Sequence, residues 1–179
     1  MTCFCATEAI LETPELESSD AVYAIALFDN EEVGSESNQG AESNMITGLV
    51  HRLAALDGDH AAARAEQSFA RSFLVSSDTA HAVHPNYAGV HEDNLRPKMN
   101  AGPVIKTNAK QRYASTAATT FLLRRIAQLA GVPLQEFEVR NDCPCGSTIG
   151  PMLSKVRTRP VHHPLTRSLC APWTWATRS

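Results

Sequence analysis

The chain has 179 residues, of which 43% are hydrophobic and 20% charged, and its formal net charge is -3. This size and composition are typical of one globular domain, and the mild negative charge gives no general attraction to nucleic acid or anionic lipid. No apolar run approaches the roughly 20 residues that cross a bilayer, so we expect neither nucleic-acid nor membrane binding.

The first half of the chain shows helix and strand patterns in alternation. Residues 2–11 are compatible with a helix, and residues 21–28 form an apolar run of the length expected for a strand buried on both faces. Such a strand favours a parallel sheet. Apolar residues at helical spacing follow from Met45 to Leu56, and an alanine-rich helical pattern continues over residues 61–70.

The second half continues this alternation. A short strand is predicted at residues 72–76 and ends near Asp78, and the aperiodic stretch 79–102 has the length of a functional loop. Extended structure resumes at residues 104–106. A helix is then predicted from a Ser115 cap to residue 130. Its inward residues are expected to be Phe121, Leu122, Ile126 and Leu129.

A last strand is predicted at residues 137–139, just before a turn rich in cysteine and proline. Strands that alternate with helices favour an α/β layered fold with right-handed crossovers. We therefore expect helices on both faces of a sheet.

The cysteines indicate a reducing compartment. Five cysteines cannot all pair within the chain, and the first residues lack the basic flank and apolar core of a secretory signal, so we expect a cytoplasmic protein. Cys3/Cys5 and Cys143/Cys145 are each separated by one residue, which is closer than the usual zinc-knuckle spacing. We interpret them as structural thiols outside any metal site.

Carboxylates and imidazoles gather just after the predicted strand ends. Because the carboxyl ends of parallel strands face one crevice, these side chains would meet there, and zinc favours such ligands. Taken alone, the residues are equally compatible with solvated loops and hydrogen-bonded loop histidines. The set comprises Asp29, Glu31, Glu32, Asp78, His81 and His84.

Three further side chains could bind a substrate. Lys106 ends a short apolar strand, where it is either a surface cation or a substrate ligand. Arg112 and Tyr113 precede the predicted helix and could bind an anion or polarise a carbonyl group, or could merely pack the loop.

The residues resemble the aspartyl aminopeptidases, a family of co-catalytic zinc exopeptidases, in four segments that occur in the right order. These are LFDNEEVGSESNQGA, SSDTAHAVHPNYAGVHEDNLRP, GPVIKTNAKQRYAS and VRNDCPCGSTIGP, and the resemblance as a whole covers about residues 2–153. HAVHPNY and KQRYAS are similar to the aspartyl branch rather than to the vacuolar branch. The resemblance implies a three-layer zinc-exopeptidase-like α/β fold that is incomplete at both ends.

The resemblance also implies roles around a pair of zinc ions. Glu31 would be the general base that activates a metal-bound water, Glu32 would bind one zinc ion and Asp78 the other. The implied reaction is hydrolysis of the peptide bond after an N-terminal Asp or Glu, in an enzyme that is a homo-oligomer.

Substrate contacts are implied in the same way. Lys106 would pair with the acidic side chain of the substrate's N-terminal residue. His81 and Tyr113 would line the pocket, where they would position the substrate or stabilise the tetrahedral intermediate.

Three metal ligands of the resembled family lack a counterpart in this sequence. They are a histidine far upstream, a bridging aspartate in an RLDN-like segment and a histidine in a PQLSMHS-like segment. We therefore expect residues 1–154 to be a partial zinc aminopeptidase catalytic domain that is inactive alone. The alternative is a non-catalytic fragment that at most associates with full-length aminopeptidase subunits.

The carboxyl-terminal residues 155–179 form a basic segment without this resemblance. Tryptophan has a single codon, so reading from each codon's third base turns Trp173-Thr174 into aspartate and Trp175-Ala176 into glycine. The shifted frame permits Leu-Asp-Leu-Gly, which resembles the family segment before the missing downstream histidine. We expect this tail to be translated out of frame, through a retained intron or a gene-model error, and to be poorly ordered.

Overall fold

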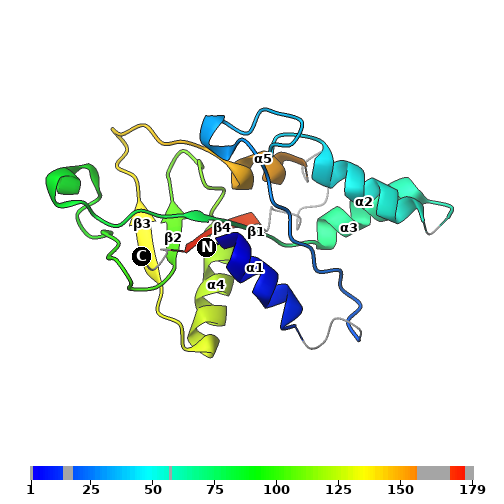
Figure 1. Ribbon diagram of the computed structural model, residues 1–179, viewed down its shortest axis with the longest axis horizontal. Coiled ribbons are helices and arrows are strands. Elements are labelled where there is room, and N and C mark those ends of the chain that lie inside the picture. Colours follow the sequence, from blue (N-terminus) through cyan, green and yellow to red (C-terminus); the bar gives the residue numbers. More distant parts are fainter. Residues whose placement is uncertain (1, 14–17, 57, 157–169, 176–179) are drawn as a thin grey trace.

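The computed structural model describes residues 2–13, 18–56, 58–156 and 170–175. Its four strands form one sheet in the order β1-β4-β2-β3 (Figure 1). Their bounds are Leu74–Thr79 for β1, Val104–Thr107 for β2, Gln135–Glu138 for β3 and Cys170–Trp175 for β4. β1 is parallel to β4 and β2 to β3, whereas β2 and β4 are antiparallel, so the described sheet is mixed rather than purely parallel.

Helices lie on both sides of this sheet, and the predicted α/β class is confirmed. α1 and α4 lie on one side and α5 on the other, while α2 and α3 pack against each other at one end (Figure 1). The bounds are Thr2–Leu11 for α1, Met45–Ala55 for α2, Ala61–Arg71 for α3, Ala117–Ala130 for α4 and Ile149–Val156 for α5. Two 3-10 turns, η1 (Glu31–Val33) and η2 (Pro85–Val90), lie in loops.

Helix α4 begins one residue later than predicted, because Thr116 rather than Ser115 is its N-cap. The Thr116 side chain accepts a hydrogen bond from the Thr119 backbone, and the Thr119 side chain accepts one from the Thr116 backbone. This capping box satisfies two backbone donors that would otherwise lack partners. The Ser115 hydroxyl instead donates to the Lys106 carbonyl, which ties the helix entry to β2.

The predicted inward face of α4 is wrong. Its four predicted inward residues are all exposed, and the buried ones are Thr119, Thr120, Leu123 and Ala127. Leu123 packs with Ile105 of β2 to form the centre of the core. The reason is that both sides of α4 carry apolar residues at helical spacing, so the sequence alone does not decide which side meets the sheet.

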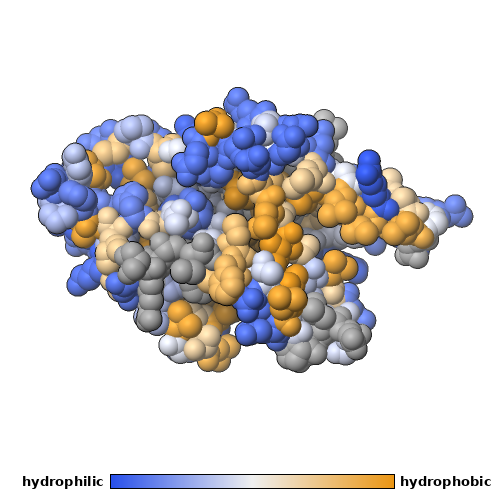
Figure 2. All heavy atoms as spheres, in the orientation of Figure 1, coloured by the Kyte–Doolittle hydropathy of each residue, from blue (hydrophilic) through white to orange (hydrophobic). Residues whose placement is uncertain are grey.

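The strand predicted at residues 21–28 is also wrong. This segment has no regular secondary structure, and its side chains are largely exposed, with Val22 at 85%. A buried strand needs a hydrogen-bonded neighbour, and none of the described strands pairs with this segment. Apolar surface crosses the middle of the visible face over α1, α2 and this segment (Figure 2).

Most of the expected tail, at residues 157–169 and 176–179, lies outside the described residues. Within residues 155–179, the structure describes the end of α5 and strand β4, which lies between β1 and β2 in the sheet. Among the described helices, none has the length and apolar character that a bilayer span requires.

Candidate active site

Glu31 and Glu32 are held side by side by a tight turn at the end of the apolar segment. Asn30 on one side of η1 and Gly34 on the other both have left-handed backbones, with φ of 59° and 105°. The Ser35 amide donates to the Asn30 carbonyl at 2.8 Å and closes the turn. Glu31 is half-buried and Glu32 exposed, so the two carboxylates have different surroundings.

Asp78 of β1 and Lys106 of β2 meet although the two strands are separated by β4 and are antiparallel to each other. The Lys106 ammonium donates to Asp78 Oδ2 at 3.2 Å and to the Thr79 carbonyl at 3.0 Å. Lys106 is only 9% exposed. A buried ammonium needs such partners, because desolvation without them would cost several kcal/mol. Of the two alternatives for Lys106, the solvent-facing surface cation is therefore excluded.

The charges of Asp78 and Lys106 act on the Glu31 carboxylate. Burial raises the pKa of Glu31 above its usual value, and the nearby charges of Asp78 and Glu32 raise it further. The Lys106 ammonium and a hydrogen bond from the Thr148 side chain act in the opposite direction on this pKa. A carboxylate with a raised pKa is a better proton acceptor near neutral pH, as a general base must be.

The Tyr113 ring lies beside the Lys106 ammonium. Lys106 Nζ lies 5.5 Å from the centre of the Tyr113 ring, within the range of a cation–π contact. The Cys145 thiol donates to the Tyr113 hydroxyl at 3.1 Å. Burial raises the pKa of Tyr113 well above its usual range. Tyr113 is therefore a neutral phenol over the whole ordinary pH range.

His81 lies beside this group of residues rather than inside it. Its ring packs edge-on against His91 and Phe137, with centroid distances of 5.4 and 5.6 Å. Phe137 of β3 is the register partner of Lys106, so His81 lies over the neighbouring strand at the same end of the sheet. The structure thus brings Glu31, Asp78, Lys106 and Tyr113 together and sets His81 next to them.

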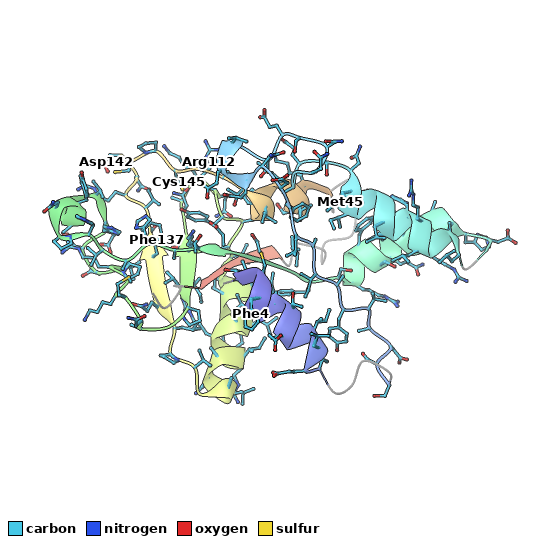
Figure 3. All side chains as sticks on the ribbon, in the orientation of Figure 1. Phe4, Met45, Arg112, Phe137, Asp142 and Cys145 are labelled. Atoms are coloured by element: carbon cyan, nitrogen blue, oxygen red, sulfur yellow. The ribbon has the colours of Figure 1, made fainter. Side chains whose placement is uncertain are left out.

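The other predicted candidates have local roles. The His84 ring accepts a hydrogen bond from the Asn86 amide and caps η2, and the Asp29 carboxylate accepts one from the Asn30 amide. The Arg112 side chain is exposed, while its carbonyl accepts a hydrogen bond from the Ser147 hydroxyl. Arg112 lies in the loop after β2 and Cys145 in the loop after β3 (Figure 3), and hydrogen bonds at Ser147 and Tyr113 join these two loops.

Two side chains at this site were not singled out from the sequence. Thr148 hydrogen-bonds Glu31, and Cys145 hydrogen-bonds Tyr113. Both belong to the segment VRNDCPCGSTIGP, which carried the resemblance. The position of both residues in that segment was the sequence feature that could have identified them. The short cysteine spacing led us instead to interpret Cys145 as a structural thiol.

The described residues do not form a complete metal site. Within them, no three His, Cys, Asp or Glu side chains lie close enough together to hold one ion. Zinc sites in proteins generally use three or four protein ligands. Glu32 and Asp78 alone therefore do not complete a zinc site.

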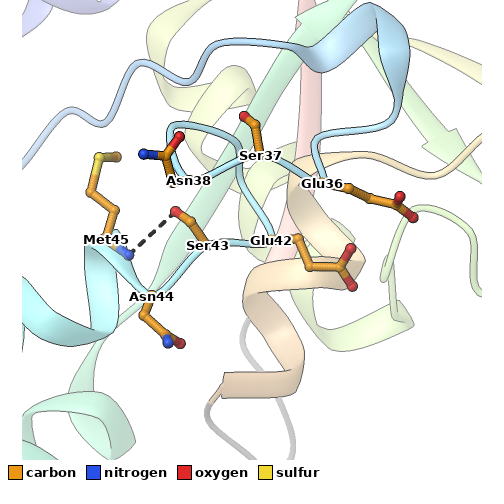
Figure 4. Close-up of a pocket in the computed structure, with 7 residues that line it drawn as sticks. All are labelled: Glu36, Ser37, Asn38, Glu42, Ser43, Asn44 and Met45. Carbon is orange, nitrogen blue, oxygen red and sulfur yellow. Dashed lines mark hydrogen bonds between the residues drawn. The ribbon is translucent and has the colours of Figure 1, made fainter.

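An open hollow lies elsewhere, between η1 and the start of α2 (Figure 4). The Met45 amide donates to Ser43 Oγ there at 3.3 Å. Its lining contains none of the predicted site residues and consists of Glu36, Ser37, Asn38, Glu42, Ser43, Asn44 and Met45. The predicted site residues thus gather around β1 and β2 and not in this hollow.

Comparison with known families shows which family the chain belongs to. The chain matches the aminopeptidase I zinc metalloprotease family (M18) over residues 1–158. The chain belongs to this M18 family. The predicted relationship to aminopeptidases is thereby confirmed, and its relatives are metallohydrolases.

Individual M18 relatives agree with this assignment. The chain is 47% identical over 166 residues to the aspartyl aminopeptidase of Aspergillus oryzae, covering 84% of this chain and 33% of the relative. It is 45% identical over 168 residues to aspartyl aminopeptidase 1 of Schizosaccharomyces pombe, covering 90% and 35%. The chain thus spans about a third of the length of these curated M18 relatives.

Solved structures of M18 aminopeptidases show the same fold. In the cryo-EM structure of the Ape4 and Nbr1 complex, the match has a TM-score of 0.84 at 42% identity and covers 97% of this chain and 31% of the other. For the crystal structure of prApe1, the TM-score is 0.78 at 25% identity, with coverage of 99% and 36%.

Proposed function

We propose that this chain is the part of an aspartyl aminopeptidase that carries the general base and the recognition site for an acidic N-terminal residue. The observation that carries the proposal is the buried Lys106 ammonium, which lies between Asp78 and Tyr113. The M18 family and the aspartyl aminopeptidase relatives support it. The substrates would be peptides that begin with Asp or Glu.

Two residues of the chain would form hydrogen bonds with the bound substrate. Lys106 would form a charge-assisted hydrogen bond with the acidic side chain, and its burial would strengthen that bond relative to an exposed lysine. Tyr113, as a neutral phenol, would donate a hydrogen bond to the scissile carbonyl oxygen as negative charge develops on it.

Glu31 would move the protons. It would accept a proton from the attacking water and later return it to the leaving amine, a task that its raised pKa supports. His81, which lies beside Phe137, would limit the space available to the substrate's first residue.

We include zinc in this proposal because the matching family is described as a zinc metalloprotease family. Glu32 and Asp78 are the residues of this chain that we assign to zinc, one for each of the two ions of a complete site. Because the described residues do not complete a three-ligand group, we propose that residues 1–154 form a partial catalytic domain that is inactive alone.

A chimera tests the catalytic assignment. Residues 1–154 would replace the matching third of the Aspergillus oryzae aspartyl aminopeptidase, and the chimera is expected to release aspartate from an Asp-peptide. Glu31→Gln should lower turnover by about a thousandfold or more, because the general base is lost. The control Glu36→Gln, an exposed carboxylate just past the turn, should leave turnover unchanged.

The same chimera tests recognition by Lys106. Lys106→Met should lower kcat/KM for an Asp-peptide relative to an Ala-peptide by about 10- to 100-fold, since a hydrogen bond between charged groups is lost. Lys110→Met, at an exposed lysine of the following loop, is the matched control. An unchanged preference for Asp in Lys106→Met would remove Lys106 from the recognition site.

The isolated chain tests the proposed inactivity. We expect less than one zinc ion per chain and no release of aspartate, and hydrolysis that Glu31→Gln abolishes would contradict this. The free thiols of Cys3, Cys5, Cys143 and Cys145 support a reducing, cytoplasmic location as part of the same proposal.

A second candidate function is association with full-length aminopeptidase subunits. The exposed apolar segment 21–28 favours it, because contiguous apolar surface marks interaction sites. One solved relative from Saccharomyces cerevisiae is a dodecamer, which supports homo-oligomers as the assembly in which this would occur. Co-purification with a full-length relative, without hydrolysis by the chain itself, would support this candidate.

We also propose that residues 155–179 are a non-homologous tail translated out of frame. The family match ends at residue 158, which supports a boundary close to residue 154. Sequencing of the spliced transcript tests the idea. A message that encodes this tail in this frame, without a retained intron, would overturn it.

A further inference from the structure

Cys145 lies next to the proposed site but has no role in the proposed reaction. It lies in the loop that joins β3 to α5, 32 residues after Tyr113, and its thiol reaches the Tyr113 hydroxyl at 3.1 Å. In the described part of the chain, this is the one hydrogen bond to that hydroxyl. Its neighbour Cys143 points to Asp142 Oδ1 instead, at 3.8 Å.

The loops that carry Tyr113 and Cys145 are fixed to each other by more than this contact. The Ser147 hydroxyl donates to the Arg112 carbonyl at 3.2 Å. A side chain at Gly150 would come within 3.3 Å of the Tyr113 carbonyl, so the start of α5 packs closely on the Tyr113 backbone. These contacts fix the Tyr113 backbone, and the orientation of its hydroxyl is left to Cys145.

The direction of the hydrogen bond decides what Tyr113 can do. A phenol has one hydrogen and accepts through its oxygen lone pairs. When the thiol donates, the phenol hydrogen stays available to a substrate oxygen. The thiol has one hydrogen and two acceptors in reach, since the Gly146 carbonyl lies at 3.3 Å. If the thiol turned to that carbonyl, Tyr113 would donate to sulfur and lose its hydrogen for the substrate.

We propose that Cys145 is a positioning residue, whose thiol donates to the Tyr113 hydroxyl and so keeps the phenol hydrogen free for the substrate carbonyl. This inference rests on the proposed aminopeptidase function for its purpose. The hydrogen bond itself does not depend on that function. Cys145 touches no reacting atom and acts only through Tyr113.

Raman spectroscopy of the full chain tests the hydrogen bond without any need for activity. The tyrosine doublet in the Raman spectrum differs between a phenol oxygen that accepts a hydrogen bond and one that only donates. Subtracting the spectrum of Tyr113→Phe isolates Tyr113 from Tyr23 and Tyr87, the other two tyrosines. The wild-type chain should show the doublet of an accepting phenol.

The variants give a matched series. Cys145→Ser keeps a donor and should keep the accepting doublet, whereas Cys145→Ala should lose it. Cys145→Val also removes the donor but keeps most of the side-chain volume, so it serves if the alanine variant does not fold. Cys143→Ala removes the neighbouring thiol and should match the wild-type spectrum.

Two results would overturn the proposal. One is a wild-type doublet typical of a phenol that only donates, which would mean that Tyr113 donates to sulfur. The other is an accepting doublet that survives in both Cys145→Ala and Cys145→Val. Failure of the aminopeptidase function shows instead in the chimera's hydrolysis of an Asp-peptide, so the two failures are distinguishable.

Discussion

The Lys106–Asp78 ion pair allows a quantitative test of how the site is held together. We consider Lys106→Met, Asp78→Asn and the double variant in the full chain. The two side chains are 11% and 31% exposed, and Nζ lies 3.2 Å from Oδ2. A hydrogen bond between charged groups contributes about 1.5–3 kcal/mol when well shielded, and the partial exposure of Asp78 places this pair near the lower end.

The expected coupling free energy between Lys106 and Asp78 is therefore about 1–2 kcal/mol. Lys106→Met alone should cost more, roughly 2–3 kcal/mol, because it also leaves the Thr79 carbonyl without the ammonium donor. Urea unfolding followed by circular dichroism gives each free energy, provided that the slopes of the variants agree.

The pair Arg96–Asp93 is the control for this cycle. Its side chains are 38% and 86% exposed, so its coupling should be about 0–1 kcal/mol and should weaken further at high salt. If the Lys106–Asp78 coupling is no larger than that of Arg96–Asp93, the ammonium is not held at the site in the way described.

Further predictions concern His91, Gly102 and Thr116. Burial, the His81 ring and Arg96 lower the pKa of His91 below its ordinary value of 6.5, so the unfolded chain binds a proton that the folded chain resists. Stability should be greatest above pH 6.5 and fall as the pH drops toward the lowered pKa, and thermal unfolding of His91→Phe should show a weaker pH dependence than His84→Gln. Gly102→Ala should cost about 2–4 kcal/mol, because φ is 102° and the new Cβ would lie 2.1 Å from the Pro133 carbonyl oxygen, whereas Gly89→Ala meets nothing within 4 Å. Thr116→Ala should cost about 1 kcal/mol of unfolding free energy through loss of the α4 cap, while Thr116→Ser should cost far less.

Most of the helices and strands could be predicted from local patterns, because turn residues and helical spacing are local properties. The helices at 2–11 and 61–70 are examples. The segment 21–28 could not, since a strand exists only with a pairing neighbour, and pairing is a property of the whole sheet. The buried face of α4 could not be predicted for a similar reason. The buried face combines Thr119 and Thr120 with Leu123 and Ala127, whereas the large apolar residues of the predicted face are exposed.

Some residues of the candidate site could likewise be selected from the sequence, and others could not. Glu31, Asp78 and Lys106 were selected because each lies at the end of an apolar run, and the structure brings them together although residues 21–28 form no strand and β1 and β2 are antiparallel. The contribution of the loop after β3 was not predictable from spacing, because Thr148 and Cys145 reach the site only through tertiary packing. The same loop composition would suit an ordinary turn.

The exposed segment 21–28 has a consequence for handling the chain. Its sequence, Ala-Val-Tyr-Ala-Ile-Ala-Leu-Phe, combines β-branched and aromatic residues with no charge, proline or glycine, and its Val22 and Leu27 are 85% and 58% exposed. Segments of this kind stack into intermolecular sheets. Expressed without a covering surface, the chain should therefore aggregate or be retained by chaperones as its concentration rises.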